Sequence, residues 1–168
     1  MRHWSSLGGW MEIRAVTLRV WLVVLTLLSI GGLRSSAQDA STAQTRAAIE
    51  SVLDKQQDAW NRKDLNGFMA GYWNSPDLTF FSGAHRTSGW QGALERYRKT
   101  YQGENKEMGK LDFYDLRIEP LGTDSAFVRG AWHLTMSDGK TPHGLFTLVF
   151  HRFTDGWKII HDHTSAAE

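Results

Sequence analysis

The sequence predicts an α+β fold in which about three helices pack on one face of a bent, mostly antiparallel sheet. Two observations support this prediction. In the first half of residues 38–168, apolar side chains recur at three- and four-residue spacing, whereas in the second half they recur at every second position. Short turns that contain glycine or aspartate separate the alternating segments, which is typical of antiparallel strands joined in chain order.

The first two helices follow from their apolar spacing and from their ends. A long amphipathic helix is predicted over Thr42–Arg62. Asp64 is a good N-cap for a second helix over Leu65–Trp73, because its side chain can accept hydrogen bonds from the first free backbone N–H groups. Asn74-Ser75-Pro76 is expected to end this second helix.

A strand and the third helix come next. Leu78–Ser82 is apolar and aromatic and is predicted to be a strand, and Gly83–Thr87 is predicted to be a polar loop. Ser88-Gly89-Trp90-Gln91 has the pattern of a capping box, so we expect a helix to start there and to continue to about Tyr101.

Four longer strands are predicted after a charged loop over Gly103–Gly109. In the third of them, His143–Phe153, apolar residues lie on both sides of the strand, so both faces of the sheet need a cover. The helices can cover only one face, and we therefore expect a homodimer through the sheet. The four strands are Leu111–Leu121, Ser125–Ser137, His143–Phe153 and Trp157–Thr164.

Residues 1–37 are predicted to be a secretory signal peptide. Arg14 and Arg19 supply a positive segment, Val20–Ile30 is an apolar run, and Ser35-Ser36-Ala37 is a small-residue cleavage site. The apolar run is shorter than the roughly 20 residues that span a bilayer, so we expect no membrane anchor after cleavage. This predicts a periplasmic or secreted protein.

Two alternatives at this end remain open. Met11 could be the true start, and a looser apolar stretch over 15–33 could act as an uncleaved anchor. After cleavage, residues 38–43 would form a flexible leader because they are small and polar, and 44–166 would form the folded domain.

The composition excludes several classes of function. The 168 residues contain no cysteine, so this chain can form no disulfide, thiol nucleophile or cysteine-ligated zinc site. Residues 38–168 have a formal charge of −2 and contain no basic run, which argues against a nucleic-acid partner. Neither a nucleophile elbow nor a glycine-rich phosphate loop is present.

Four segments carry a further signal: Phe68–Trp73, Leu78–Gly83, Gly89-Trp90 and Gly156–Ser165. Together with the order of the elements, they resemble the nuclear transport factor 2-like superfamily, and most of all its SnoaL-like, ketosteroid-isomerase-like bacterial branch. The last segment is also similar to the end of the association domain of calcium/calmodulin-dependent protein kinase II. The resemblance covers about Thr42–Ser165. It implies a cone-shaped fold, in which a curved sheet wraps around the helices and a pocket opens between sheet and helices. It also implies dimerisation through the sheet, but no single activity.

The candidate catalytic residues are Asp162, His161 and His163. In a regular strand, both histidines share one face with Trp157 and Ile159, whereas Asp162 lies on the other face. A histidine titrates near working pH, and an aspartate in an apolar pocket can do so with a raised pKa, so either could be a general base. Alternatively, the histidines form hydrogen bonds at the dimer face and Asp162 has a structural role.

No metal or other cofactor is expected. His161, His163 and His151 could offer three nitrogen ligands, as a catalytic zinc requires, but no carboxylate stands in a recognisable ligand motif.

Pocket walls are predicted from aromatic residues at element ends or on inward faces, a lining that suits a small apolar or aromatic ligand. Plain core packing is the alternative for each of them. An arginine in the loop after the first strand could hold an anionic group at the rim. The predicted pocket residues are Tyr72, Trp73, Phe80, Arg86, Trp90, Tyr97 and Trp132.

The predicted function is therefore that of an exported small-molecule-binding domain, with cofactor-independent acid/base catalysis of the isomerase or dehydratase type as an open possibility. Ketosteroid isomerase chemistry needs an aspartate base, a tyrosine donor and a second, protonated acid. Asp162 and Tyr72 could supply the first two, but the sequence places no second acid. The alternative is a non-catalytic dimeric module that binds a ligand or a protein.

Overall fold

The computed structural model describes residues 37–167. The chain divides into a unit of residues 1–43 and a larger unit of residues 44–168. The predicted signal peptide lies outside the described residues except for its last residue, and residues 37–43, which include the predicted leader, are helical. Within the described part of the chain, none of the helices combines the length and the apolar character needed to cross a membrane.

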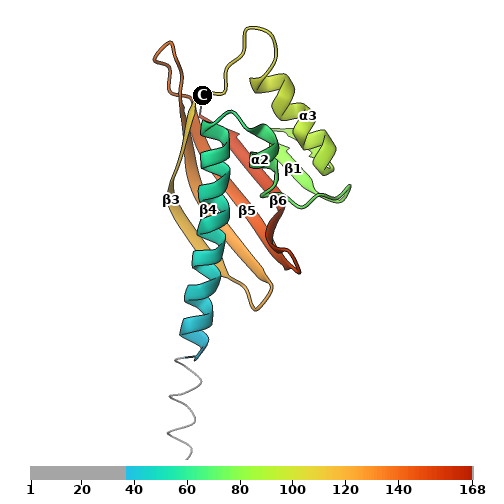
Figure 1. The fold of residues 1–168 in the computed structure, drawn as a ribbon, viewed down its shortest axis with the longest axis vertical. Helices are drawn as coiled ribbons and strands as arrows, with labels where there is room; N and C mark the ends of the chain where they lie inside the picture. Colours follow the sequence, from blue (N-terminus) through green and yellow to red (C-terminus); the bar gives the residue numbers. More distant parts are fainter. Residues whose placement is uncertain (1–36, 168) are drawn as a thin grey trace, which may run out of the picture. The chain divides into compact units, whose positions relative to one another are not determined.

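The larger unit has the predicted α+β order (Figure 1). A long helix continues to residue 61, and all four later strands form as predicted to within a few residues. The elements that follow the long helix are α2 (Leu65–Met69), β1 (Thr79–Ser82), β2 (His85–Ser88), α3 (Trp90–Tyr101), β3 (Lys110–Pro120), β4 (Ser125–Thr135), β5 (His143–Phe153) and β6 (Gly156–Ala166).

One six-stranded sheet has the order β2-β1-β6-β5-β4-β3. The strands β3 to β6 form an antiparallel meander, because β4, β5 and β6 each pair with the strand that precedes them along the chain. The strand β1 runs parallel to β6 and antiparallel to β2. The sheet is therefore mostly antiparallel, and β1 and β6 are brought side by side from distant parts of the sequence.

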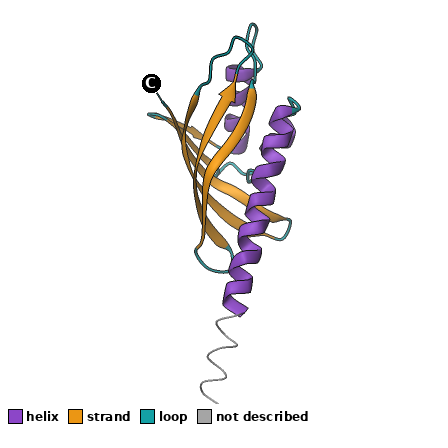
Figure 2. Cartoon of the chain, turned by 90° about the vertical axis from the view of Figure 1, so that its left-hand side faces the viewer, coloured by secondary structure: helices purple, strands orange, loops and turns teal. Residues whose placement is uncertain are grey.

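The core lies between the curved sheet and the helices, which the two ribbon views place against the same face of the sheet (Figures 1 and 2). Ile49 and Leu53 of the long helix, Leu94 of α3 and Phe150 of β5 are at most 3% exposed. Burial of a side chain of this size stabilises a fold by about 1.5–3 kcal/mol. The apolar stripes found in the sequence thus form this core.

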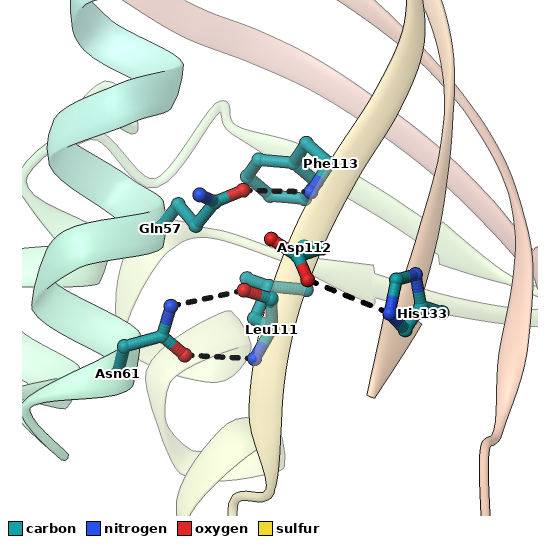
Figure 3. A network of polar contacts seen from close by, with 6 residues as sticks. All are labelled: Gln57, Asn61, Leu111, Asp112, Phe113 and His133. Carbon is teal, nitrogen blue, oxygen red and sulfur yellow. Dashed lines mark hydrogen bonds and ion pairs between the residues drawn. The ribbon is translucent and has the colours of Figure 1, made fainter. Parts of the chain in front are cut away.

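Side-chain amides fix the long helix to the outer edge of β3 (Figure 3). Asn61 Nδ2 donates to the carbonyl of Leu111 at 2.9 Å, and Asn61 Oδ1 accepts from the Leu111 backbone N–H at 2.7 Å. Gln57 Oε1 accepts from the backbone N–H of Phe113 at 2.7 Å. These bonds satisfy backbone groups of an edge strand that would otherwise be open to another chain.

The structure differs from the sequence prediction in the segment before α3. Residues 83–87 are predicted to be a loop, but only residues 83 and 84 form a turn, and the rest belongs to β2, which pairs with β1. The predicted capping box does not form, because Ser88 belongs to the β-ladder and Gly89 takes the N-cap position without a side-chain hydrogen bond. Gly89 has a φ of 77°, a conformation in which a side chain would be strained. In contrast, the Asp64 cap of α2 is present, since its carboxylate accepts from the Gly67 N–H at 2.8 Å.

Candidate functional site

A cavity of about 170 Å³ lies between the helices and the inner face of the sheet. This volume is close to that of an engineered cavity that accommodates benzene, so one small ring fits. Tyr72, Phe80, Ile159 and Asp162 are each at most 4% exposed and form its inner end. Most of the remaining wall is apolar, from Leu53, Trp60, Phe68, Tyr97, Tyr101, Leu111, Phe113, Trp132, Leu134, Phe146 and Leu148.

A β-bulge in β6 aims Asp162 into this cavity. Val149 pairs with His161 whereas Phe150 pairs with Ile159, so Ile160 is an extra residue without a partner on β5. An extra residue interrupts the alternation of side chains between the two faces. As a result, Asp162 lies on the same face as Ile159, and both line the cavity.

The chain after α2 brings Tyr72 to this same point. Its backbone pairs with Ile159, since the Trp73 N–H donates to the Ile159 carbonyl at 2.9 Å and the Ile159 N–H donates to the Gly71 carbonyl at 2.9 Å. The ladder between β1 and β6 then begins at His161, beyond the bulge. The segment around Tyr72 therefore pairs with β6 before the bulge, and β1 pairs with β6 after it.

A chain of hydroxyl groups leads to the carboxylate. The Tyr72 hydroxyl donates to Asp162 Oδ2 at 2.7 Å. Because this bond uses its only proton, the Tyr97 hydroxyl, which is 3.3 Å from the Tyr72 oxygen, is the donor in the second bond. The other carboxylate oxygen, Asp162 Oδ1, is buried and has no hydrogen-bond partner among the described residues.

Burial controls the protonation of these groups. It raises the pKa of Asp162 to about 7, although the hydrogen bond from Tyr72 acts in the opposite direction. Burial and the charge of Asp162 raise the pKa of both Tyr72 and Tyr97 well above the ordinary value, so both remain proton donors at neutral pH. The carboxyl group can therefore exchange a proton near neutral pH, which an acid/base catalyst requires.

Comparison with known proteins identifies the family. The sequence profile of the SnoaL-like domain matches residues 49–168. The chain is also 36% identical to an NTF-2-like protein of unknown function from Shewanella oneidensis, over 71% of this chain and 98% of that one, with a TM-score of 0.67. The chain belongs to the SnoaL-like domain family. Through it, the chain is a member of the nuclear transport factor 2-like superfamily.

More distant structures share the fold of this SnoaL-like domain. An NTF2-like superfamily protein from Salmonella enterica is 20% identical over 75% of this chain and 93% of that one, with a TM-score of 0.59. A ketosteroid isomerase-like protein from Erwinia carotovora is 20% identical over 73% and 95%, with a TM-score of 0.55. No curated protein is similar enough to the chain to be matched.

The structure places four of the seven predicted pocket residues of the SnoaL-like domain in the cavity wall, namely Tyr72, Phe80, Tyr97 and Trp132. The other three lie elsewhere. The ring of Trp73 stacks on Phe153 with centroids 5.5 Å apart, and the Trp90 indole donates to the Met69 carbonyl at 3.0 Å. Arg86 is exposed on the edge strand β2.

Among the candidate catalytic residues, the structure separates Asp162 from the two histidines. His161 and His163 do not line the cavity, and instead flank Phe81 on the opposite face of the sheet, with ring centroids 5.0 and 5.9 Å from its ring. The regular-strand expectation that they share a face with Ile159 was wrong, because the bulge at Ile160 exchanges the faces. Burial and the neighbouring His163 lower the pKa of His161.

Some residues of the site were not found from the sequence. Arg96 of α3 lines the cavity, and Gln56, which is 2% exposed, lines it from the long helix and donates to the Phe68 carbonyl at 3.0 Å. A polar residue within an apolar helical stripe is a signal that could have identified Gln56. Among residues 37–167, no group of three or more histidine, aspartate or glutamate side chains could hold a metal ion.

Tyr72→Phe is expected to shift any Asp162-dependent rate to higher pH. The hydrogen bond from Tyr72 lowers the pKa of Asp162 in the wild-type protein. Without this bond, the pKa of Asp162 rises above about 7. The rate of proton exchange on a bound ketone, measured against pH, tests this. Tyr97→Phe is the control, because it leaves the bond between Tyr72 and Asp162 in place. An unchanged midpoint in Tyr72→Phe would mean that the two groups are not coupled.

Proposed function

We propose that this protein binds a small, largely apolar ring compound in the cavity and that Asp162 transfers a proton at an activated carbon of the bound molecule. The observation that carries the proposal is the carboxyl group itself, which lines the cavity and has one oxygen held by Tyr72, while the other has no partner within residues 37–167. A pKa of about 7 allows it to accept a proton from carbon and return it.

The reaction would be of the isomerase or dehydratase type. Asp162 would remove a proton from the carbon next to a carbonyl group and deliver it to another carbon or to a leaving hydroxyl. Asp162 is the only acidic residue buried within residues 37–167, so a second protonated acid for the developing oxyanion is not present there. Tyr72 and Tyr97 remain protonated, but their hydroxyl groups already donate to Asp162 and to Tyr72, so one of them would have to leave its present acceptor to donate to the oxyanion.

The test is the conversion of a β,γ-unsaturated cyclohexenone to its conjugated isomer, followed by ultraviolet absorbance. This substrate needs one proton removed from carbon and one returned, and its single ring matches the cavity. We expect wild-type protein to accelerate the reaction, with a rate that rises with pH through about 7 as Asp162 ionises. Absence of acceleration at all pH values would support the non-catalytic alternative.

A second candidate function is that of a dimeric binding module, which the outer face of the sheet favours. Phe146, Leu148 and Phe150 of β5 point into the core, while Leu145 of the same strand is 66% exposed. Tyr114 of β3 is 41% exposed and lies on the same outer face, because Tyr114 pairs with Ala131 and Ala131 pairs with Leu145 across neighbouring strands. We propose that two copies associate through this face, because contiguous exposed apolar surface marks contact sites.

Leu145→Glu is expected to convert a dimer into a monomer in light scattering at tens of micromolar protein, because it would place a charge in the contact. Leu121→Glu is the matched control. Leu121 is 64% exposed but lies in the turn between β3 and β4, outside the sheet face. A wild-type protein that is already monomeric at this concentration would contradict the proposed contact.

Export rests on the sequence of residues 1–37 alone, and we propose it on that ground. Amino-terminal sequencing of protein recovered from a periplasmic fraction is expected to find a chain that starts near Gln38. Recovery of a chain that retains Met11 would contradict cleavage.

A further inference from the structure

Arg96 places a positive charge at the rim of the cavity. It lies on α3, lines the cavity, and holds its guanidinium carbon 5.8 Å from the centroid of the Phe80 ring. Its charge also partly offsets the effect of burial on the pKa of Tyr101, which is another wall residue. The guanidinium therefore faces the aromatic wall of the cavity and does not extend away from the protein.

The Arg96 guanidinium is not neutralised by the protein. Among residues 37–167, no carboxylate lies within ion-pair distance of it, and it donates no hydrogen bond to a described residue, whereas Arg129 and Lys158 each pair with an acidic side chain. Of the described residues that line the cavity, Arg96 is also the only cationic one. Its planar set of N–H donors is thus free for a ligand, and such a set matches a carboxylate.

The polarity of the cavity changes along its length. Thr100 and Ser165 are exposed residues of the lining, and Ser82 and Thr164 are half-buried, so hydroxyl groups accompany Arg96 at the open end. The inner end consists of buried aromatic and aliphatic groups around Asp162. A ligand that matches both ends has an apolar ring and an anionic group.

We propose that the ligand is a small cyclic or aromatic carboxylate, whose carboxylate binds Arg96 at the rim while its ring extends toward Asp162. This inference rests on the proposed function, since it requires that the cavity take a small molecule. Arg96 would then determine specificity and orientation. The contact with the Phe80 ring restricts the guanidinium before binding, which reduces the entropy lost when the ligand is held.

Binding of trans-cinnamate and of its neutral isostere cinnamamide tests the proposal. The indole N–H signals of Trp60 and Trp132, two residues of the cavity wall, report binding in NMR titrations. We expect the wild-type protein to bind cinnamate about tenfold more tightly than cinnamamide, because a charge-assisted bond to arginine is stronger than a neutral one. Arg96→Gln should remove this preference, and Arg96→Lys should retain part of it.

Arg98→Gln is the matched control, because Arg98 lies on the same helix, is exposed and is not part of the lining. It should keep the full preference for cinnamate. Equal affinity of wild-type protein for both compounds, or a preference that persists in Arg96→Gln, would overturn the role of Arg96 and leave ligand binding in the cavity intact. Failure of both compounds to shift the two indole signals at millimolar concentration would contradict the proposed function and this inference together.

Discussion

Asp162→Asn is expected to lower the rate of proton transfer at carbon by about 100- to 10 000-fold, the range that positioned general acids and bases contribute. Asparagine has nearly the same shape and can still accept the hydrogen bond from the Tyr72 hydroxyl, so the cavity should remain. It cannot take a proton from carbon at neutral pH. Isomerisation of the β,γ-unsaturated cyclohexenone by wild-type and variant protein provides the measurement.

Asp155→Asn is the control for this experiment. Asp155 lies in the turn before β6, its side chain is 69% exposed, and the substitution removes the same charge outside the cavity. Its rate should equal that of the wild type. A rate in Asp162→Asn within about threefold of the wild type would exclude Asp162 as the base, because general-base catalysis contributes far more than that. The binding-module alternative would then remain.

The second large effect is on stability, and its size depends on pH. The folded-state pKa of Asp162, about 7, is higher than the ordinary value of 3.8. Between these pH values the folded protein binds more protons than the unfolded chain, so the contribution of Asp162 to stability falls as the pH rises from about 4 through 7. Roughly three pKa units at 1.36 kcal/mol each give a loss of about 4 kcal/mol in the free energy of unfolding.

Asp162→Asn removes this loss because asparagine does not titrate. At pH 4 the two proteins should have similar stability, and at pH 8 the variant should be more stable than the wild type by about 4 kcal/mol. Urea unfolding at several pH values measures the difference. Curves for the two proteins that run parallel from pH 4 to pH 8 would show that Asp162 does not change its proton affinity on folding.

These two predictions together describe a site that opposes the stability of the fold. Asp162 Oδ1 is buried without a partner in the part of the chain that the structure describes, and such groups are rare in folded proteins because their burial costs about 1–3 kcal/mol. Substitution of a catalytic residue frequently increases stability while it removes activity. A purely structural aspartate would give the opposite result, since its loss would lower stability.

Local patterns in the sequence were enough to predict most of the fold. The stripe that includes Ile49 and Leu53 forms one helix, and the Asp64 cap begins the next. The alternating segments became the antiparallel meander, because a strand with one buried face must alternate and short turns join neighbouring strands. The predicted order of elements is confirmed except for β2, which was expected to be a loop.

The site could be predicted only in part, because tertiary contacts determine its geometry. Period-two alternation predicts which side chains share a face only while the ladder is regular, and nothing in the local sequence marks Ile160 as an extra residue. The sequence therefore could not decide whether Asp162 or the two histidines enter the cavity. Arg96 was missed for a similar reason, since a helix arginine next to exposed neighbours is typical of a solvated surface.

The proton affinity of Asp162 in the ligand-free protein tests the central claim most directly. Infrared difference spectra between wild-type protein and Asp162→Asn, recorded against pH, isolate the carboxyl band of this one residue. We predict a midpoint at about pH 7, since the group is buried beside the cavity. A midpoint near the ordinary value of 3.8 would show that water or a protein donor reaches the free oxygen, and would contradict a role for Asp162 as the acid/base group.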